Sequence, residues 1–124
     1  MAVLTREAAA TRGDELALAD DDDARTWAQL DIRVNRLVHA LRAAGLGSGD
    51  TISVVSGNRN EWFEVALACS HAGVVFVPIS WHLVASEMAY IIEDSGSRAV
   101  LVGHRFTDVA AEALADPRSS AVEL

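Results

Sequence analysis

Residues 51–79 read TISVVSGNRNEWFEVALACSHAGVVFVPI, and this stretch decides the fold class. It begins with the short β-branched run Thr51–Val55 and ends with the continuous apolar run of residues 74–79, and both runs are typical of buried strands. Between them, residues 61–72 carry apolar side chains at helical spacing, two asparagines precede or open the segment as possible caps, and Gly73 closes it. The stretch therefore predicts a strand–helix–strand unit whose two strands lie parallel.

The sequence before this unit predicts a β-hairpin followed by a long helix. Two short strands, Leu16–Ala19 and residues 25–27, flank an acidic turn. The following helix has one continuous apolar face at i, i+4, i+7, i+8 and i+11, made by Leu30, Val34, Leu37, Val38 and Leu41. Thr26 and Gln29 have the spacing of a capping box, and Gly45 stands where a helix end needs a left-handed residue.

The same alternation continues beyond the central unit. Helices are expected over residues 85–94 and 106–114, and strands over residues 98–102 and 121–124. Strands that are almost continuously apolar are expected where helices cover both faces of a parallel sheet. We therefore predict an α/β fold with a mainly parallel sheet flanked by helices, in Rossmann-like or flavodoxin-like layers, preceded by a short helix over residues 5–12 and a short N-terminal β-hairpin.

Composition limits the classes of function that the chain can have. Its 124 residues, 51% hydrophobic and 23% charged, suit one globular domain. The net charge is −8, and all ten basic residues are arginine without a basic stretch, which argues against nucleic-acid binding and anionic membrane surfaces. The longest apolar run, residues 72–79, is far shorter than the ~20 residues that span a bilayer. With one cysteine and no secretory signal pattern, we predict a cytoplasmic protein.

Three features that could suggest chemistry have simpler structural interpretations. Residues 45–49 (GLGSG) resemble a phosphate loop, but they follow a helix and precede a strand, the reverse of the order that phosphate binding needs. Residues 20–23 are four consecutive aspartates, whose side chains diverge on an exposed turn and do not suit a metal ion. Cys69 shares its helix face with Trp62 and Ala66 and is predicted to be a core thiol. The four histidines have no metal-ligand spacing.

Trp81 and His82 are the candidate binding residues. They follow the apolar strand of residues 74–79, and open α/β sheets bind ligands at the carboxyl ends of their strands. Trp81 could be either a packing residue or a stacking surface. Taken alone, the residues show no catalytic constellation and no metal site.

Short motifs, taken in order, resemble the N-terminal portion of the acyl-CoA synthetases of the adenylate-forming, AMP-binding superfamily. The resemblance extends over about residues 14–105 and includes TWAQL at 26–30, GLGSGD at 45–50, NRNEW at 58–62, VPI at 77–79 and WHL at 81–83. The last part looks closest to fatty-acyl or related carboxylate:CoA ligases. Two positions depart from the family pattern: Ser80 replaces an asparagine, and Val84 replaces a capping Thr or Ser, so that the capping box with Glu87 is expected to be lost.

The resemblance implies a two-step reaction. A carboxylate attacks ATP, with magnesium, to give an acyl-adenylate and pyrophosphate, and coenzyme A then displaces AMP to give a thioester. It also implies that residues 1–124 form a single, partial AMP-binding subdomain without an internal boundary. The family's ATP-binding motifs come later in its chain, so this chain alone is expected to hold no cofactor and to be inactive. In the family, the turn matching residues 80–82 can lie against the nucleotide end of coenzyme A, which makes Trp81 and His82 candidate cofactor-binding residues.

Two alternatives remain open at this point. The first is a stand-alone α/β binding or interaction module that self-associates through an exposed sheet edge, because a strand starting at residues 121–124 would leave that edge uncovered. The second, a receiver-like signalling domain, is disfavoured because such a domain needs a lysine late in the sheet and the sequence has none. A downstream reading frame that encodes a Thr/Ser/Gly-rich loop with a lysine would favour the ligase over the stand-alone module.

Overall fold

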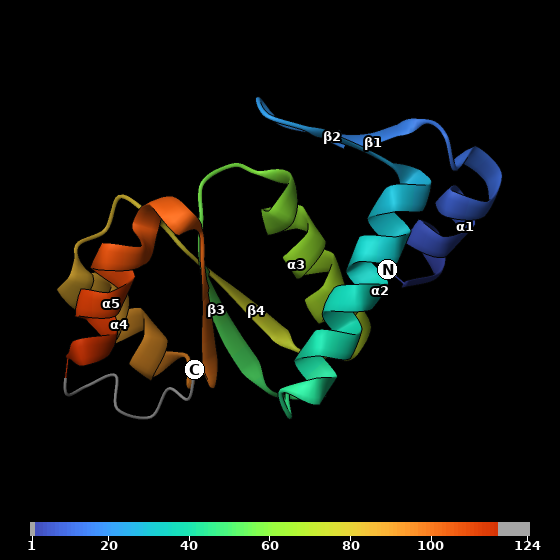
Figure 1. Ribbon diagram of the computed structural model, residues 1–124. Helices are drawn as coiled ribbons and strands as arrows, with labels where there is room; N and C mark the ends of the chain where they lie inside the picture. Colours follow the sequence, from blue (N-terminus) through green and yellow to red (C-terminus); the bar gives the residue numbers. More distant parts are fainter. Residues whose placement is uncertain (1, 117–124) are drawn as a thin grey trace. The chain divides into compact units, whose positions relative to one another are not determined.

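The computed structural model describes residues 2–116, which divide into two compact units (Figure 1). Unit 1 contains residues 2–48 and 58–74, and unit 2 contains residues 49–57 and 75–116. The strand expected over residues 121–124 lies outside the described residues. In the part of the chain that the structure describes, no helix is long and apolar enough to cross a membrane.

Unit 1 consists of three helices and the expected hairpin. Its elements are α1 (Ala2–Arg12), β1 (Leu16–Ala19), β2 (Ala24–Thr26), α2 (Trp27–Ala43) and α3 (Asn60–Ala72). The strands β1 and β2 are antiparallel, with Leu18 opposite Arg25. Helix α2 packs against both α1 and α3.

Helix α2 has the start, buried face and end that its sequence predicts. The Gln29 amide N–H donates to Thr26 Oγ1 at 3.3 Å, and the Thr26 amide N–H donates to Gln29 Oε1 at 2.9 Å, which completes the capping box. The buried residues of the helix recur at helical spacing: Leu30, Val34, Val38 and Leu41. After the helix, Gly45 adopts a φ of 79°, the left-handed conformation that glycine reaches without steric cost.

Helix α3 differs from its prediction at its start and on its buried face. Neither Asn58 nor Asn60 caps it: the N-cap is Arg59, which makes no side-chain capping bond. The buried face consists of Asn60, Glu64, Ala68 and Cys69, whereas Trp62 and Ala66, which were predicted to share the face of Cys69, are only half-buried. Two polar residues therefore occupy the inner face of a helix whose apolar pattern predicted otherwise. Gly73 ends the helix in the left-handed conformation, as expected.

Unit 2 contains a three-stranded parallel sheet, which confirms the α/β class. The strands are β3 (Thr51–Val55), β4 (Val75–Ile79) and β5 (Ala99–Val102), in the order β4-β3-β5. Residues 52–55 of the central strand are all buried. Since successive residues of a strand point to opposite faces, both faces of β3 are covered. This burial explains why the strand reads as a continuous apolar run around the single serine Ser53.

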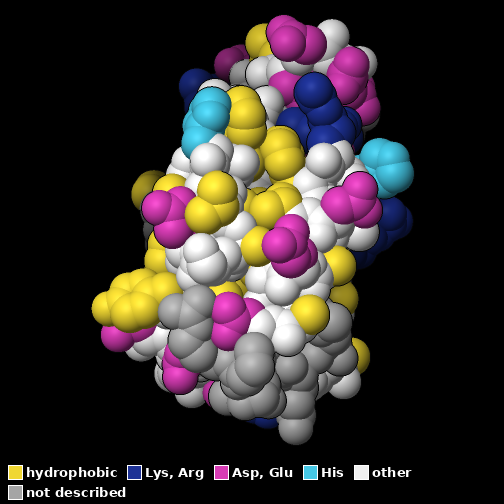
Figure 2. Space-filling view, turned by 90° about the vertical axis from the view of Figure 1, so that its left-hand side faces the viewer, with side chains coloured by type: hydrophobic (Ala, Val, Ile, Leu, Met, Phe, Trp, Pro, Cys, Tyr) yellow, Lys and Arg dark blue, Asp and Glu magenta, His cyan; other side chains and the backbone are white. Residues whose placement is uncertain are grey.

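Helices α4 (Ala85–Asp94) and α5 (Thr107–Ala115) pack against one face of this sheet, and the 3₁₀ turn η1 (His104–Phe106) leads into α5. Strand and helix residues form one buried cluster of Val55, Ile79, Met88, Ala89, Ile92, Val100 and Ala113. On the outside, α4 leaves Tyr90 58% exposed. Figure 2 shows this side of the molecule, where hydrophobic side chains reach the surface between acidic ones.

The start of α4 corrects one expectation. Half of the capping box survives the presence of Val84, because the Val84 amide N–H still donates to Glu87 Oε2 at 3.1 Å. Only the reciprocal bond is missing, since a valine side chain has no oxygen to accept it. The substitution therefore removes one of two capping bonds.

Candidate functional site

The turn after β4 brings Trp81 and His82 together with a third aromatic residue. The two rings stack with centroids 3.5 Å apart, and the Trp81 ring also stacks on Phe106 of η1, with centroids 5.5 Å apart and planes 26° from parallel. The His82 amide N–H donates to Ser80 Oγ at 3.3 Å, which fixes the turn. Trp81 remains 44% exposed, so it both packs on Phe106 and offers a surface for stacking.

The loops that follow all three strands approach the Phe106 ring. A Cβ atom on Gly103, after β5, would lie 3.4 Å from Phe106 Cδ2, and one on Gly57, after β3, would lie 3.9 Å from the same ring. The aromatic cluster thus sits at the carboxyl ends of the parallel strands, where such sheets bind ligands. Phe106 was not among the binding residues predicted from the sequence, although its position shortly after a predicted strand indicated that it could lie at this edge of the sheet.

Cys69 is a core thiol, as the sequence predicts. It is 1% exposed, and burial raises the pKa of the Cys69 thiol to about 11. The thiol is therefore protonated at neutral pH, which makes it a poor nucleophile.

The acidic turn has a structural task that the sequence did not reveal. Asp20 Oδ1 accepts hydrogen bonds from the Asp22 and Asp23 amides, and Asp20 Oδ2 accepts one from the Asn60 amide, all at 2.9 Å. The carboxylate thus caps α3 from a distant part of the chain. These bonds, that of Asn60 foremost, hold the pKa of the Asp20 carboxyl below its usual value of 3.8. Within residues 2–116, no group of three or more His, Cys, Asp or Glu side chains is placed to hold a metal ion.

Replacing Asp20 with asparagine is expected to reduce the acid sensitivity of the fold. Because the folded-state pKa is lowered, the carboxylate stabilises the protein above its unfolded pKa of about 3.8, and this stability is lost as the pH falls through the lower folded value. Urea unfolding at several pH values between 6 and 2 measures how the free energy of unfolding changes with pH. The free energy of unfolding of Asp20→Asn should fall less steeply with decreasing pH than that of the wild type. Asp21→Asn, which changes an exposed neighbouring residue, should fall as steeply as the wild type. Equal slopes for Asp20→Asn and the wild type would contradict the assignment.

A buried carboxylate joins α2, α3 and the hairpin. Glu64 is 1% exposed, and its Oε1 accepts from Arg25 Nε at 3.2 Å and from Arg33 Nε at 2.5 Å. Arg25 also pairs with Asp23. The hydrogen bond to Glu64 is the main cause that raises the pKa of Arg33 above its ordinary value. The sequence signal for this network was weak, because Asn60, Glu64 and Ala68 share a helix face that appears less apolar than its neighbour.

Comparison with known proteins identifies the family. The model of the family described as AMP-binding enzyme matches residues 5–123, and the chain belongs to this family. It is 35% identical over 99 residues to a fatty acid–[acyl-carrier-protein] ligase, ScoC, of Streptomyces coeruleorubidus, covering 80% of this chain and 19% of that protein. It is 33% identical to a 3-oxocholest-4-en-26-oate–CoA ligase of Rhodococcus rhodochrous, covering 82% of this chain and 18% of that protein.

The solved structures agree with the sequence relatives. The fatty acyl CoA synthetase of Mycobacterium tuberculosis matches with a TM-score of 0.87 and 30% identity, over 98% of this chain and 25% of that chain. The resemblance to acyl-CoA synthetases is thereby confirmed. This chain spans about a fifth of the length of the curated relatives it matches, so it corresponds to one part of such an enzyme.

Proposed function

We propose that this chain is the N-terminal segment of an ATP-dependent acyl-CoA synthetase that acts on a fatty acid or a related carboxylate. The observation that carries the proposal is the match of 98% of the chain to a fatty acyl CoA synthetase fold. The family match over residues 5–123 and the curated acyl ligases among the relatives support it. On this proposal, residues 1–124 form a single, partial AMP-binding subdomain of a cytoplasmic enzyme.

The proposed reaction has two steps. A carboxylate oxygen attacks the α-phosphorus of ATP, the bond to pyrophosphate breaks, and an acyl-adenylate forms. The thiol sulfur of coenzyme A then attacks the acyl carbon, loses its proton, and releases AMP. Magnesium supplies charge neutralisation at the phosphates, and its ligands are proposed to lie outside this segment. The segment's own contribution is the aromatic turn at the carboxyl ends of the strands.

Trp81 and His82 are proposed to lie against the nucleotide end of coenzyme A in the complete enzyme. Trp81, which stacks on His82 and Phe106, is 44% exposed, and an adenine ring can stack on an exposed aromatic side chain for about 1–3 kcal/mol per base. In the full-length enzyme, the double variant Trp81→Ala/His82→Ala should raise the Kd for coenzyme A roughly tenfold or more. Isothermal titration measures it, and Tyr90→Ala, an exposed aromatic on α4, serves as the control. An unchanged Kd in the double variant would end this assignment.

The 124-residue chain by itself is expected to show no ATP–pyrophosphate exchange with any fatty acid. The family's phosphate loop and adenine motif follow the region that this segment matches, so the first step has no ATP site here. Exchange of labelled pyrophosphate into ATP measures the activity, with the full-length protein as the positive control. Robust exchange by the purified segment would refute the proposal that the ATP site lies elsewhere.

A stand-alone interaction module is the second candidate. It is favoured by outer strand β4, which leaves Val75 50% exposed, and by the exposed Tyr90 and Val84 of the α4 region. Such surfaces could support self-association. The downstream reading frame discriminates: a Thr/Ser/Gly-rich loop with a lysine belongs to a ligase, whereas a stop without such a remnant belongs to a module.

A further inference from the structure

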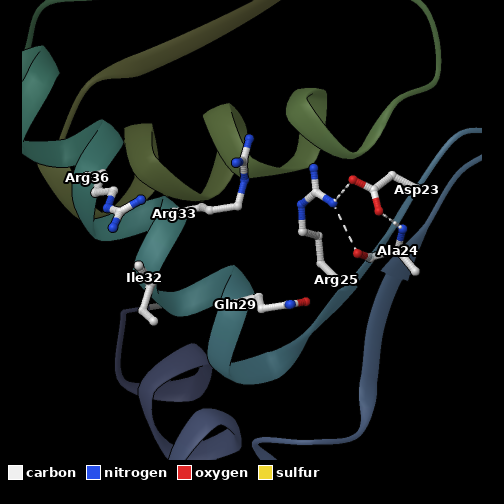
Figure 3. A pocket seen from close by; sticks show the side chains of 7 residues that line it. All are labelled: Asp23, Ala24, Arg25, Gln29, Ile32, Arg33 and Arg36. Carbon is white, nitrogen blue, oxygen red and sulfur yellow. Dashed lines mark hydrogen bonds and ion pairs between the residues drawn. The ribbon is translucent and has the colours of Figure 1, made fainter.

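Unit 1 has a pocket of about 370 Å³ that the proposed ligase reaction does not use. Figure 3 shows the residues that line it: Asp23, Ala24, Arg25, Gln29, Ile32, Arg33 and Arg36. Three of the seven are arginines, although the chain as a whole carries a net charge of −8. Arg25 is already paired with Asp23 and Glu64, so the cationic donors left for a ligand are those of Arg33 and Arg36, and an anion is the ligand that matches them.

The donors in this pocket are only partly used by the protein. Arg33 reaches Glu64 through Nε, which leaves its two terminal nitrogens as donors. Among residues 2–116, Arg36 forms no ion pair. Arg33 and Arg36 are three residues apart on α2, so they are neighbours on the helix surface and their charges repel each other. An anion between the two guanidinium groups would relieve this repulsion.

The side chains that line the pocket are oriented before a ligand binds. The buried Glu64 fixes the Arg33 side chain, and the capping box fixes Gln29 through its Oε1, which leaves the Gln29 amide nitrogen as a donor. Ile32, which is 51% exposed, supplies an apolar wall. A site whose donors are already oriented loses less conformational entropy when it binds a ligand.

We propose that this pocket binds the phosphate group of a small phosphomonoester. A phosphate has three terminal oxygens and can accept from more than one of these side chains, whereas a carboxylate has two and is satisfied by one arginine. The volume exceeds that of a phosphate group, and Ile32 can contact the organic part of the ester. The site goes beyond the ligase function and shares no residue with the Trp81–His82 turn.

The test follows the arginine Nε–Hε resonances of the 124-residue chain by NMR during titration with inorganic phosphate and with phenyl phosphate at constant ionic strength. Both probes should shift the Arg33 and Arg36 signals along a saturable single-site titration curve, and phenyl phosphate should give the lower Kd. R36Q, at an exposed position, should weaken binding at least tenfold, because it removes a charged hydrogen-bond donor from the anion.

Two matched controls separate the pocket from general charge effects. R42Q removes an exposed arginine near the end of the same helix, outside the pocket, and should change binding less than twofold. Ile32→Ala should weaken phenyl phosphate and leave inorganic phosphate unchanged. The site would be refuted if the chemical shifts did not saturate or if R36Q bound phosphate as tightly as the wild type. It would also be refuted if R42Q weakened phosphate binding as much as R36Q does. If inorganic phosphate and phenyl phosphate bound with equal affinity, the proposal that the ligand is a phosphomonoester would be refuted, and the ligand would be a free phosphate ion. None of these outcomes depends on ATP or coenzyme A binding.

Discussion

Replacing Glu64 with glutamine is expected to lower the free energy of unfolding by about 3 kcal/mol, the low end of the range for breaking a buried ion pair. The amide keeps the shape of the side chain but removes the charge that Arg25 and Arg33 share. Arg25, whose side chain is only 12% exposed, would then keep a guanidinium group without its buried partner. The loss stays at the low end because Arg33 is 41% exposed and can turn to water. Urea unfolding measures it.

Glu61→Gln is the matched control for this variant. Glu61 lies on the same helix, its side chain is 45% exposed, and it approaches Arg25 only to 3.9 Å. Surface pairs of this kind contribute about 0–1 kcal/mol, so the control should change stability little. If Glu64→Gln and Glu61→Gln had the same small effect, the buried carboxylate would not hold α2, α3 and the hairpin together.

Replacing Ile92 with alanine is expected to cost about 3 kcal/mol, within the range for large-to-small changes in a core. Ile92 is 1% exposed and belongs to the cluster that joins α4 to the sheet. Removing three carbons leaves a cavity among Val55, Met88 and Val100, which the neighbouring strands cannot collapse to fill. Thermal or urea unfolding followed by circular dichroism measures the change.

Ile32→Ala is the control, since it makes the same substitution in another helix at a position 51% exposed. Its cost should be below about 1 kcal/mol, because little apolar area is removed from contact and alanine favours helix. Similar losses for the two variants would show that packing of Ile92 against the sheet does not dominate the stability of α4.

Local signals explain why α2 could be predicted almost to the residue. Thr26 and Gln29 form a cap within four residues, and the apolar face repeats along one helix. The information that specifies these features is contained within a short stretch of chain. The glycine stretch after α2 was interpreted correctly for the same reason, because the left-handed Gly45 follows a helix directly.

Helix α3 could not be predicted in the same way, because its environment is distant in sequence. Asp20 caps it from 40 residues upstream, and Arg25 and Arg33 determine that Glu64 is buried. No periodicity within residues 60–72 contains that information, so Trp62, Ala66 and Cys69 were predicted to form the inner face, although only Cys69 of these three is fully buried. Phe106 joined the candidate site through the same kind of long-range contact, since only the parallel register brings the ends of β4 and β5 near each other.

The order of the segments has a consequence for any attempt to shorten this protein. Unit 1 is built from residues 2–48 and 58–74, with the central strand of unit 2 inserted between them, so the chain passes between the units three times. No single cut separates the two units from each other. A fragment ending at residue 57 would contain Arg25 and Arg33 without their carboxylate, and a fragment beginning at residue 58 would contain β4 and β5 without the strand between them. A gene shortened to end at residue 57 should therefore encode a chain that does not fold, because Arg25 and Arg33 lose Glu64.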